Sequence, residues 1–362
     1  MATIYDVAQL AGVSAKTVSR VLNGEGPVGP RTREAVEGAM AELGYVPSNA
    51  ARMMRSNRSG LIGVVTGAIS AAQEPTRPAG LPDLLIVQGI QQVLAARDMT
   101  VMVADTAGRA DRVPPLVQTF LEHRAEGLIY VADHHQRVDL PPLRRPTPLV
   151  LANCLDGAGT PAVLPDDRRG QSDLVARVIA AGHRRIAYIT LREDMEATPL
   201  RTLGYREALE RAGLPFDPAL VRAGYLSDGE GETAHLDGAI DRVLGLADPP
   251  TVICCGNDAM AMRVYGLLRS RGIRVPDDLG VAGYDNYRVI AETLHPPLTT
   301  VDLPYAAMGA RAAERLLALI SGQGRDDRTP TLVAGPVHWR DSVTTRVAEP
   351  SQQSERRMGG TT

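Results

Sequence analysis

The chain has 362 residues, which is more than one ordinary hydrophobic core holds and favours two or three domains. Its net charge of −3 and hydrophobic fraction of 44% are typical of a globular protein and exclude a strongly basic, nonspecific nucleic-acid binder. No apolar run approaches the ~20 residues that span a bilayer. The first residues lack the basic and apolar regions of a signal peptide, so we expect a cytoplasmic protein.

Charge is distributed unevenly along the chain. Residues 1–60 contain seven basic and five acidic side chains, a net charge of +2, whereas the remainder is acidic. This small excess has the sign expected of a segment that contacts DNA.

Residues 4–23 have the pattern of two short helices joined by a glycine turn. Thr3 and Asp6 have the spacing of a capping box, and Gly12 permits the left-handed turn that ends the first helix. Ser14 is a good N-cap for the second helix. Such a pair is typical of a helix-turn-helix.

The second helix is expected to have two unlike faces. Val18, Val21 and Leu22 form an apolar face, while small and basic side chains point the other way. Lys16 and Arg20 are four residues apart, so they lie on one side and can donate to O6 and N7 of guanine. Lys16 is the only lysine in the chain.

A third helix is expected over residues 32–43 and ends at Gly44, so that three helices bury a small core. A helical subdomain with a solvated polar face would show the same pattern without contacting DNA. The residues alone therefore leave both interpretations open.

Residues 48–55 favour a helix that Ser48 can cap. The segment is shorter than the ~12–15 residues that an isolated helix needs in water. We therefore expect it to become ordered only by docking.

From Gly60 onward, apolar runs alternate with amphipathic stretches. The expected strands are 61–65, 101–104, 127–131, 148–152, 185–190, 251–255 and 280–283. The expected helices are 86–96, 113–123, 172–181, 202–212 and 259–271. This alternation predicts an α/β protein with two parallel-sheet lobes, and a ligand in the cleft beyond the carboxyl ends of the strands.

The three cysteines, Cys154, Cys254 and Cys255, indicate neither a disulfide framework nor a zinc motif, because their number is odd and two are adjacent. Cys254 and Cys255 end an apolar run, so we expect buried thiols. We expect no metal and no cofactor.

Several sequence segments occur together in an order typical of one family. They are 3–14, 17–23, 32–34, 41–47, 182–187, 204–209, 257–261, 275–278, 283–285 and 297–301. In these segments the chain closely resembles the lactose/galactose repressor (LacI/GalR) family, over roughly residues 3–343. The resemblance implies an N-terminal all-α helix-turn-helix headpiece and a periplasmic-binding-protein-like α/β core of two parallel-sheet lobes.

The resemblance also implies a division of the chain. The headpiece covers 1–46, a hinge helix and linker 47–59, and the effector-binding and dimerisation core 60–345. Lobe 1 is expected at about 60–160 and 293–325, and lobe 2 at about 161–292 and 326–345. The polar tail 346–362 has no leucine heptad for a tetramerising coil and is expected to be disordered.

The resemblance assigns DNA contacts by position. The base-reading residues would be Ala15, Lys16 and Arg20. Phosphate contacts, which orient the headpiece, would come mainly from Tyr5, Ser14, Thr17, Ser19 and Asn23.

In the hinge, the resemblance places Asn49, Arg52 and Met54 at the DNA. Met54 stands where an apolar wedge, usually Leu, opens a central base step in the minor groove. The alternative is that Met53 and Met54 pack against the core or the partner hinge.

The effector site is expected in the cleft between the lobes. The positions that the resemblance assigns to it are Asn153, Arg201, Leu226, Asn257, Asp285 and Leu303. Arg, Asp and Asn together suit the hydroxyls of a sugar-like ligand. Each could instead be a strand-end cap or part of an ordinary ion pair. Leu226 stands where an aromatic residue is common in the family, and Leu303 stands where some members have a polar contact. Segment 67–85 is longer than in the family and differs from it in sequence.

The sequence thus predicts a homodimeric transcriptional repressor that binds a pseudo-palindromic operator and responds to a small sugar-like effector. A small-molecule binding protein with a degenerate DNA-binding head is the alternative. An enzyme is not expected, because the chain has no Gly-rich phosphate loop, no nucleophile elbow and no metal spacing. His183 is expected to be structural, since it lacks a nucleophile partner.

Overall fold

The computed structural model describes residues 2–24, 26–45, 58–67, 81–140, 147–225, 232–324 and 327–346. The predicted hinge helix, including Asn49, Arg52 and Met54, lies outside these ranges. So do Leu226 and nearly all of the C-terminal tail.

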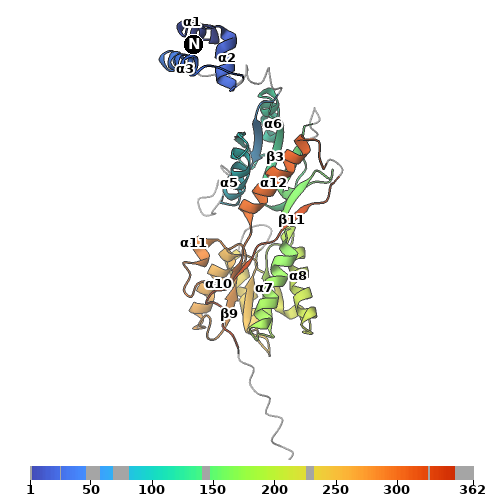
Figure 1. Ribbon diagram of the computed structural model, residues 1–362. Coiled ribbons are helices and arrows are strands. Elements are labelled where there is room, and N and C mark those ends of the chain that lie inside the picture. The colour runs from blue at the N-terminus through green and yellow to red at the C-terminus, as the bar shows by residue number, and fades with distance from the viewer. Residues whose placement is uncertain are drawn as a thin grey trace, which may run out of the picture.

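The headpiece consists of α1 (Ile4–Leu10), α2 (Ala15–Asn23) and α3 (Pro30–Glu42) (Figure 1). Both predicted caps are confirmed: Thr3 and Asp6 form a capping box, and the Ser14 side chain accepts the Thr17 backbone N–H. The small core of the three helices contains six buried side chains, Val7, Ala8, Val18, Val21, Val36 and Ala39.

The third helix begins two residues earlier than predicted. Pro30 occupies its first turn, where a missing backbone N–H costs nothing and the fixed φ suits a helix. Gly44 ends it with φ 57°, as expected.

The first sheet has six strands in the order β11-β5-β4-β3-β1-β2, and all of its pairs are parallel. The strands are β1 (Leu61–Thr66), β2 (Thr100–Asp105), β3 (Gly127–Arg137), β4 (Leu149–Leu155), β5 (Ala162–Pro165) and β11 (Thr331–Val333). On one face pack α5 (Leu81–Ala95) and α12 (Tyr305–Ile320), and on the other α6 (Val113–Glu122). A short 3-10 helix, Ala110–Arg112, precedes α6.

Helices α5 and α12 lie side by side because glycine allows their backbones to approach (Figure 1). A Cβ at Gly89 would lie 1.9 Å from the carbonyl oxygen of Ala306. A Cβ at Gly309 would lie 2.0 Å from the carbonyl oxygen of Ile86. Both glycines are therefore required by the packing of the first lobe.

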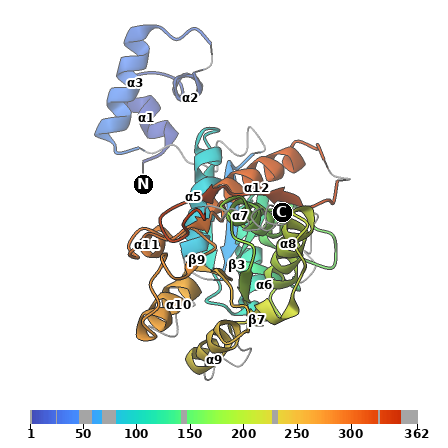
Figure 2. The ribbon, with the colours of Figure 1, turned by 90° about the horizontal axis from the view of Figure 1, so that it is seen from below.

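The second sheet is also parallel, in the order β7-β6-β8-β9. Its strands are β6 (Ile186–Thr190), β7 (Val221–Ala223), β8 (Val252–Cys255) and β9 (Gly280–Ala282). One face is covered by α7 (Asp167–Ala180) and α8 (Ala197–Arg211), the other by α9 (Glu232–Leu244) and α10 (Asp258–Ser270). Figure 2 shows α8 and α10 on opposite sides of this sheet. A 3-10 turn, Pro218–Leu220, leads into β7.

The lobe boundaries differ from those expected. β5 and β11 both pair in the first sheet, so lobe 1 includes residues that we had placed in lobe 2 from 161 and from 326. The segment after 293 was expected in lobe 1, yet Leu298 and Val301 pack in the core of lobe 2. The chain passes back into lobe 1 only at α12.

Short elements complete the junction between the lobes. β10 (Thr300–Val301) pairs antiparallel with β12 (Val337–His338), and α11 (Arg288–Ala291) follows β9. Three chain segments cross between the lobes: from β5 to α7, from β10 to α12, and from β11 to β12. Such a triple connection allows the lobes to rotate relative to each other without unfolding.

Candidate functional site: the reading helix and the interlobe cleft

The exposed face of α2 carries the predicted base-reading side chains. Lys16 and Arg20 are exposed and Ala15 is half-buried, while Val18 and Val21 face the core. The helix therefore presents two donor side chains from one rigid element, as base reading requires.

The predicted phosphate-contacting residues surround this face. Tyr5 is 74% exposed on α1, and Ser19 and Thr17 are half-buried on α2. The hydroxyls of Ser14 and Thr17 lie 3.0 Å apart at the helix N-terminus. Asn23 is the last residue of α2, and its side chain is outside the described part of the structure.

A cavity of about 420 Å³ opens between the lobes at the carboxyl ends of β8 and β9. Its described walls are Leu85, Asn257, Ala259, Asp285, Asn286, Tyr287, Arg288, Val289, Ile290, Asp302, Leu303 and Tyr305. Of the six predicted effector-site residues, Asn257, Asp285 and Leu303 line it. The walls are apolar around a few polar groups, as in ligand cavities generally.

Asp285 is a half-buried acidic group in the wall of this cavity. It directly follows the second-lobe sheet, with φ 115°, and its backbone N–H donates to the carbonyl of Val301. Burial raises the pKa of its carboxyl well above the usual value, an effect that the nearby Arg201 opposes. No described residue donates a hydrogen bond to this carboxylate, so a ligand can do so.

Asn257 serves both as a helix cap and as a cavity wall. Its Oδ1 accepts the backbone N–H of Met260 at 2.8 Å and the hydroxyl of Tyr225 at 3.3 Å. The capping interpretation is thus correct for the oxygen. The amide nitrogen keeps two donors for a ligand.

Arg201 is not among the described walls of the cavity, although the sequence predicted that it contacts the ligand. Its side chain is 4% exposed, its Nε donates to Asp167 Oδ1 at 2.7 Å, and its Nη1 donates to the carbonyl of Gly256 at 2.6 Å. The guanidinium carbon lies 3.6 Å from the ring centroid of Tyr284. The ion-pair alternative therefore describes this arginine, which lies behind Asp285.

Asn153 is also buried away from the cavity walls. It has φ 62°, and its Nδ2 donates to the carbonyl of Ala132 at 3.0 Å. It lies within β4 and links that strand to β3 in the first lobe.

Asp258 supports the cavity from behind and was not predicted. It lies beside Asn257, is fully buried, and accepts the backbone N–H of Tyr287 at 2.7 Å and the hydroxyl of Thr300 at 2.6 Å. Burial raises its pKa to about 7, although both hydrogen bonds favour the charged form. Asp302, Asn286, Tyr287 and Tyr305 were likewise missed, because they lie on loops and at a helix start without a periodic pattern.

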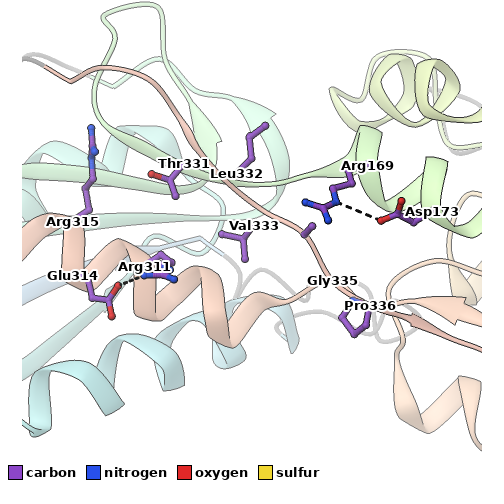
Figure 3. A pocket seen from close by; sticks show the side chains of 11 residues that line it. Arg169, Asp173, Arg311, Glu314, Arg315, Thr331, Leu332, Val333, Gly335 and Pro336 are labelled. Atoms are coloured by element: carbon purple, nitrogen blue, oxygen red, sulfur yellow. Dashed lines mark hydrogen bonds and ion pairs between the residues drawn. The ribbon is translucent and has the colours of Figure 1, made fainter. Parts of the chain in front are cut away.

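A second hollow, of about 750 Å³, lies between α7, α12 and the segment around β11 (Figure 3). Its charged walls are paired among themselves: Arg169 lies 3.5 Å from Asp173, and Arg311 lies 2.9 Å from Glu314. The remaining charged wall residue, Arg315, lies 2.9 Å from Asp327, so each charged group of the hollow already has a partner.

Other candidate chemistry is structural. His183 is buried, its Nε2 donates to the carbonyl of Thr344 at 2.8 Å, and its Nδ1 lies 2.9 Å from the Thr251 hydroxyl. All three cysteines are buried, and burial raises the pKa of Cys254 to about 12. Within the described ranges no group of His, Cys, Asp and Glu could hold a metal, and no helix could cross a membrane.

Two family models match the chain. Residues 3–48 match the bacterial regulatory proteins of the lacI family, and residues 175–343 match a periplasmic binding protein-like domain. These two matches coincide with the headpiece and with much of the two-lobed core.

Known proteins match over nearly the whole chain. The sucrose operon repressor of Escherichia coli is 33% identical over 336 residues, which cover 91% of this chain and 97% of that protein. The Lac repressor dimer bound to operator and the anti-inducer ONPF matches with a TM-score of 0.72 at 27% identity, over 94% of this chain and 98% of that one. The complex of the transcriptional regulator CelR with cellobiose matches with a TM-score of 0.60 at 29% identity, over 94% and 100%. The chain therefore belongs to the lacI family of bacterial regulatory proteins.

Proposed function

We propose that the protein is a cytoplasmic, sequence-specific DNA-binding repressor whose operator affinity is set by a small sugar-like effector in the interlobe cavity. The observation that carries this proposal is the combination of an exposed Lys16–Arg20 face on a well-capped α2 with a mostly apolar cavity between two lobes that three chain segments join. A binding protein whose headpiece no longer contacts DNA would not need the exposed Lys16–Arg20 face.

The sugar-like class of the effector rests on the cavity groups and on relatives. The Asp285 carboxyl can hydrogen-bond with two hydroxyls and the Asn257 amide can donate to a third, which is the usual polar recognition of a polyol. Two of the relatives named above are a sucrose operon repressor and a regulator in complex with cellobiose.

The regulator would act as a homodimer. Two copies of α2 would reach half-sites of a pseudo-palindrome, and the hinge residues Asn49, Arg52 and Met54 would enter the minor groove between them. An effector can shift the lobes, and through them the hinge pairing, only by as much as its affinity for the two states differs.

Selection of DNA from a random pool by the purified full chain tests this proposal. We expect a pseudo-palindrome to be enriched, and a panel of mono- and disaccharides to contain a compound that changes binding to it. Failure to enrich any palindrome would favour the binding protein with a degenerate head.

A further inference from the structure

Strand β3 reaches further than its apolar run predicts. The expected strand ended at Val131, but β3 continues to Arg137 through a register shift between Val131 and Gln136. The extension brings two side chains of the first lobe against the second lobe, His135 and Arg137.

These two contacts differ in burial. His135 Nδ1 lies 2.8 Å from Asp167 Oδ2, with side chains that are 5% and 0% exposed. Arg137 Nε lies 2.8 Å from Glu196 Oε1, with side chains that are 65% and 30% exposed. A buried hydrogen bond to a charged group is worth more than an exposed ion pair, so the His135 contact is the stronger link.

The carboxylate of Asp167 is shared between the lobes. Its Oδ2 meets His135 of the first lobe, and its Oδ1 accepts from Arg201 Nε of the second. Burial alone would raise the pKa of Asp167, but Arg201 and His135 together hold it below the usual value. The carboxylate is therefore an acceptor, and Nδ1 of His135 carries the hydrogen.

The Asp167–Arg201 contact involves a single oxygen and a single nitrogen. A guanidinium and a carboxylate otherwise prefer a two-pronged pair. His135 meets the second oxygen of Asp167, while Arg201 Nη1 donates to the carbonyl of Gly256 and the guanidinium stacks on Tyr284. Loss of the His135 donor would release the Asp167 carboxylate from the first lobe, and so change the surroundings of the guanidinium that this carboxylate holds.

The position of Arg201 matters to the cavity because its two other contacts adjoin cavity residues. Gly256, which accepts from its Nη1, precedes Asn257, and Tyr284, on which it stacks, precedes Asp285. We infer that His135 is a positioning residue of the first lobe that, through Asp167, fixes Arg201 behind Asp285, so that the effector site is complete only in one arrangement of the two lobes. This inference rests on the proposed effector site. Effector binding and lobe rotation are then coupled, so that a change in one shifts the equilibrium of the other.

The test compares three variants of the full chain. His135→Leu removes the donor, His135→Asn places an amide nitrogen where Nδ1 stands, and Arg137→Leu breaks the other interlobe contact on the same strand. The first readout is the 15N–1H signal of Arg201 Nε. The second is the half-releasing concentration, which is the effector concentration at which half of the bound operator is released.

We expect His135→Leu to move the Arg201 signal and to raise the half-releasing concentration about tenfold. His135→Asn should keep both near the parent values, and so should Arg137→Leu. An unchanged Arg201 signal in His135→Leu, or an equal change in Arg137→Leu, would overturn the inference.

One measurement needs no substitution. In imidazole-labelled parent protein, Nδ1 of His135 must carry hydrogen at neutral pH, and a bare Nδ1 would overturn the inference even if His135→Leu fails to fold. Failure of the effector site itself would look different: Asp285→Asn would leave operator release unchanged while the Arg201 signal still depended on His135.

Discussion

The hydroxyl of Thr300 donates to Oδ1 of Asp258 at 2.6 Å, and both side chains are fully buried. The carboxyl has a pKa of about 7 in the folded chain, against an ordinary value of 3.8, chiefly because burial disfavours its charge. The folded state therefore binds a proton that the unfolded state releases between about pH 4 and pH 7.

This difference predicts how stability depends on pH. Stability from Asp258 is fully present below about pH 4 and is lost as the pH rises to about 7. Asp258→Asn keeps a neutral group that can donate to Thr300 and accept from Tyr287. The variant should gain stability relative to the parent as the pH rises from 5 to 8, measured by urea unfolding. A constant difference between the two proteins would contradict the raised pKa.

Arg201→Ala should unfold the second lobe more easily. The substitution leaves the carboxylate of Asp167, which is fully buried, without its guanidinium partner. Removal of one member of a buried pair costs about 3–5 kcal/mol. We therefore expect a lower melting temperature. An unchanged melting temperature would show that Asp167 finds another partner.

Asp285→Asn should weaken effector binding without weakening operator binding. The loss of a hydrogen bond between this carboxyl and a ligand corresponds to roughly a tenfold higher half-releasing concentration. Asp248→Asn, on an exposed side chain of the same lobe, is the matched control and should behave as the parent. Release of the operator by Asp285→Asn at the same effector concentration as the parent would contradict the assignment of this cavity as the effector site.

Gly309→Ala should destabilise the first lobe. The new Cβ would lie 2.0 Å from the Ile86 carbonyl oxygen, so α5 and α12 must separate, and overpacking of this kind costs roughly 1–3 kcal/mol. Gly266→Ala is the control, because that glycine is exposed in α10 with nothing within 4 Å. It should stabilise the chain by roughly 0.4–1 kcal/mol. Equal effects of the two substitutions on chemical unfolding would refute the close crossing.

The headpiece and the sheet strands with long apolar runs were predictable, because caps and periodicity are local. Thr3, Ser14 and Gly12 act as the sequence indicated. The sequence did not predict five strands of two to four residues, which are β5, β7, β10, β11 and β12. Such short segments show no hydrophobic periodicity. The lobe boundaries moved because β5 and β11 complete a sheet built from distant segments.

The cavity was only partly predictable for the same reason. Asn257 and Asp285 follow strand ends, which is a local signal, and both line it. Arg201 and Asn153 have the right chemistry, but tertiary partners turn them away from it. Asp258 and His135 have no local signal, because their roles depend on Thr300 and Asp167 from other parts of the chain.

Reading of an operator by α2 is tested most directly by binding Arg20→Ala to a set of operator variants, each changed at one base pair. Because Arg20 is exposed on the face opposite Val18 and Val21, we expect a loss of about 1–3 kcal/mol and relaxed preference at a single position of each half-site. An equal loss on all sequences, operator and random DNA alike, would contradict base reading by this helix.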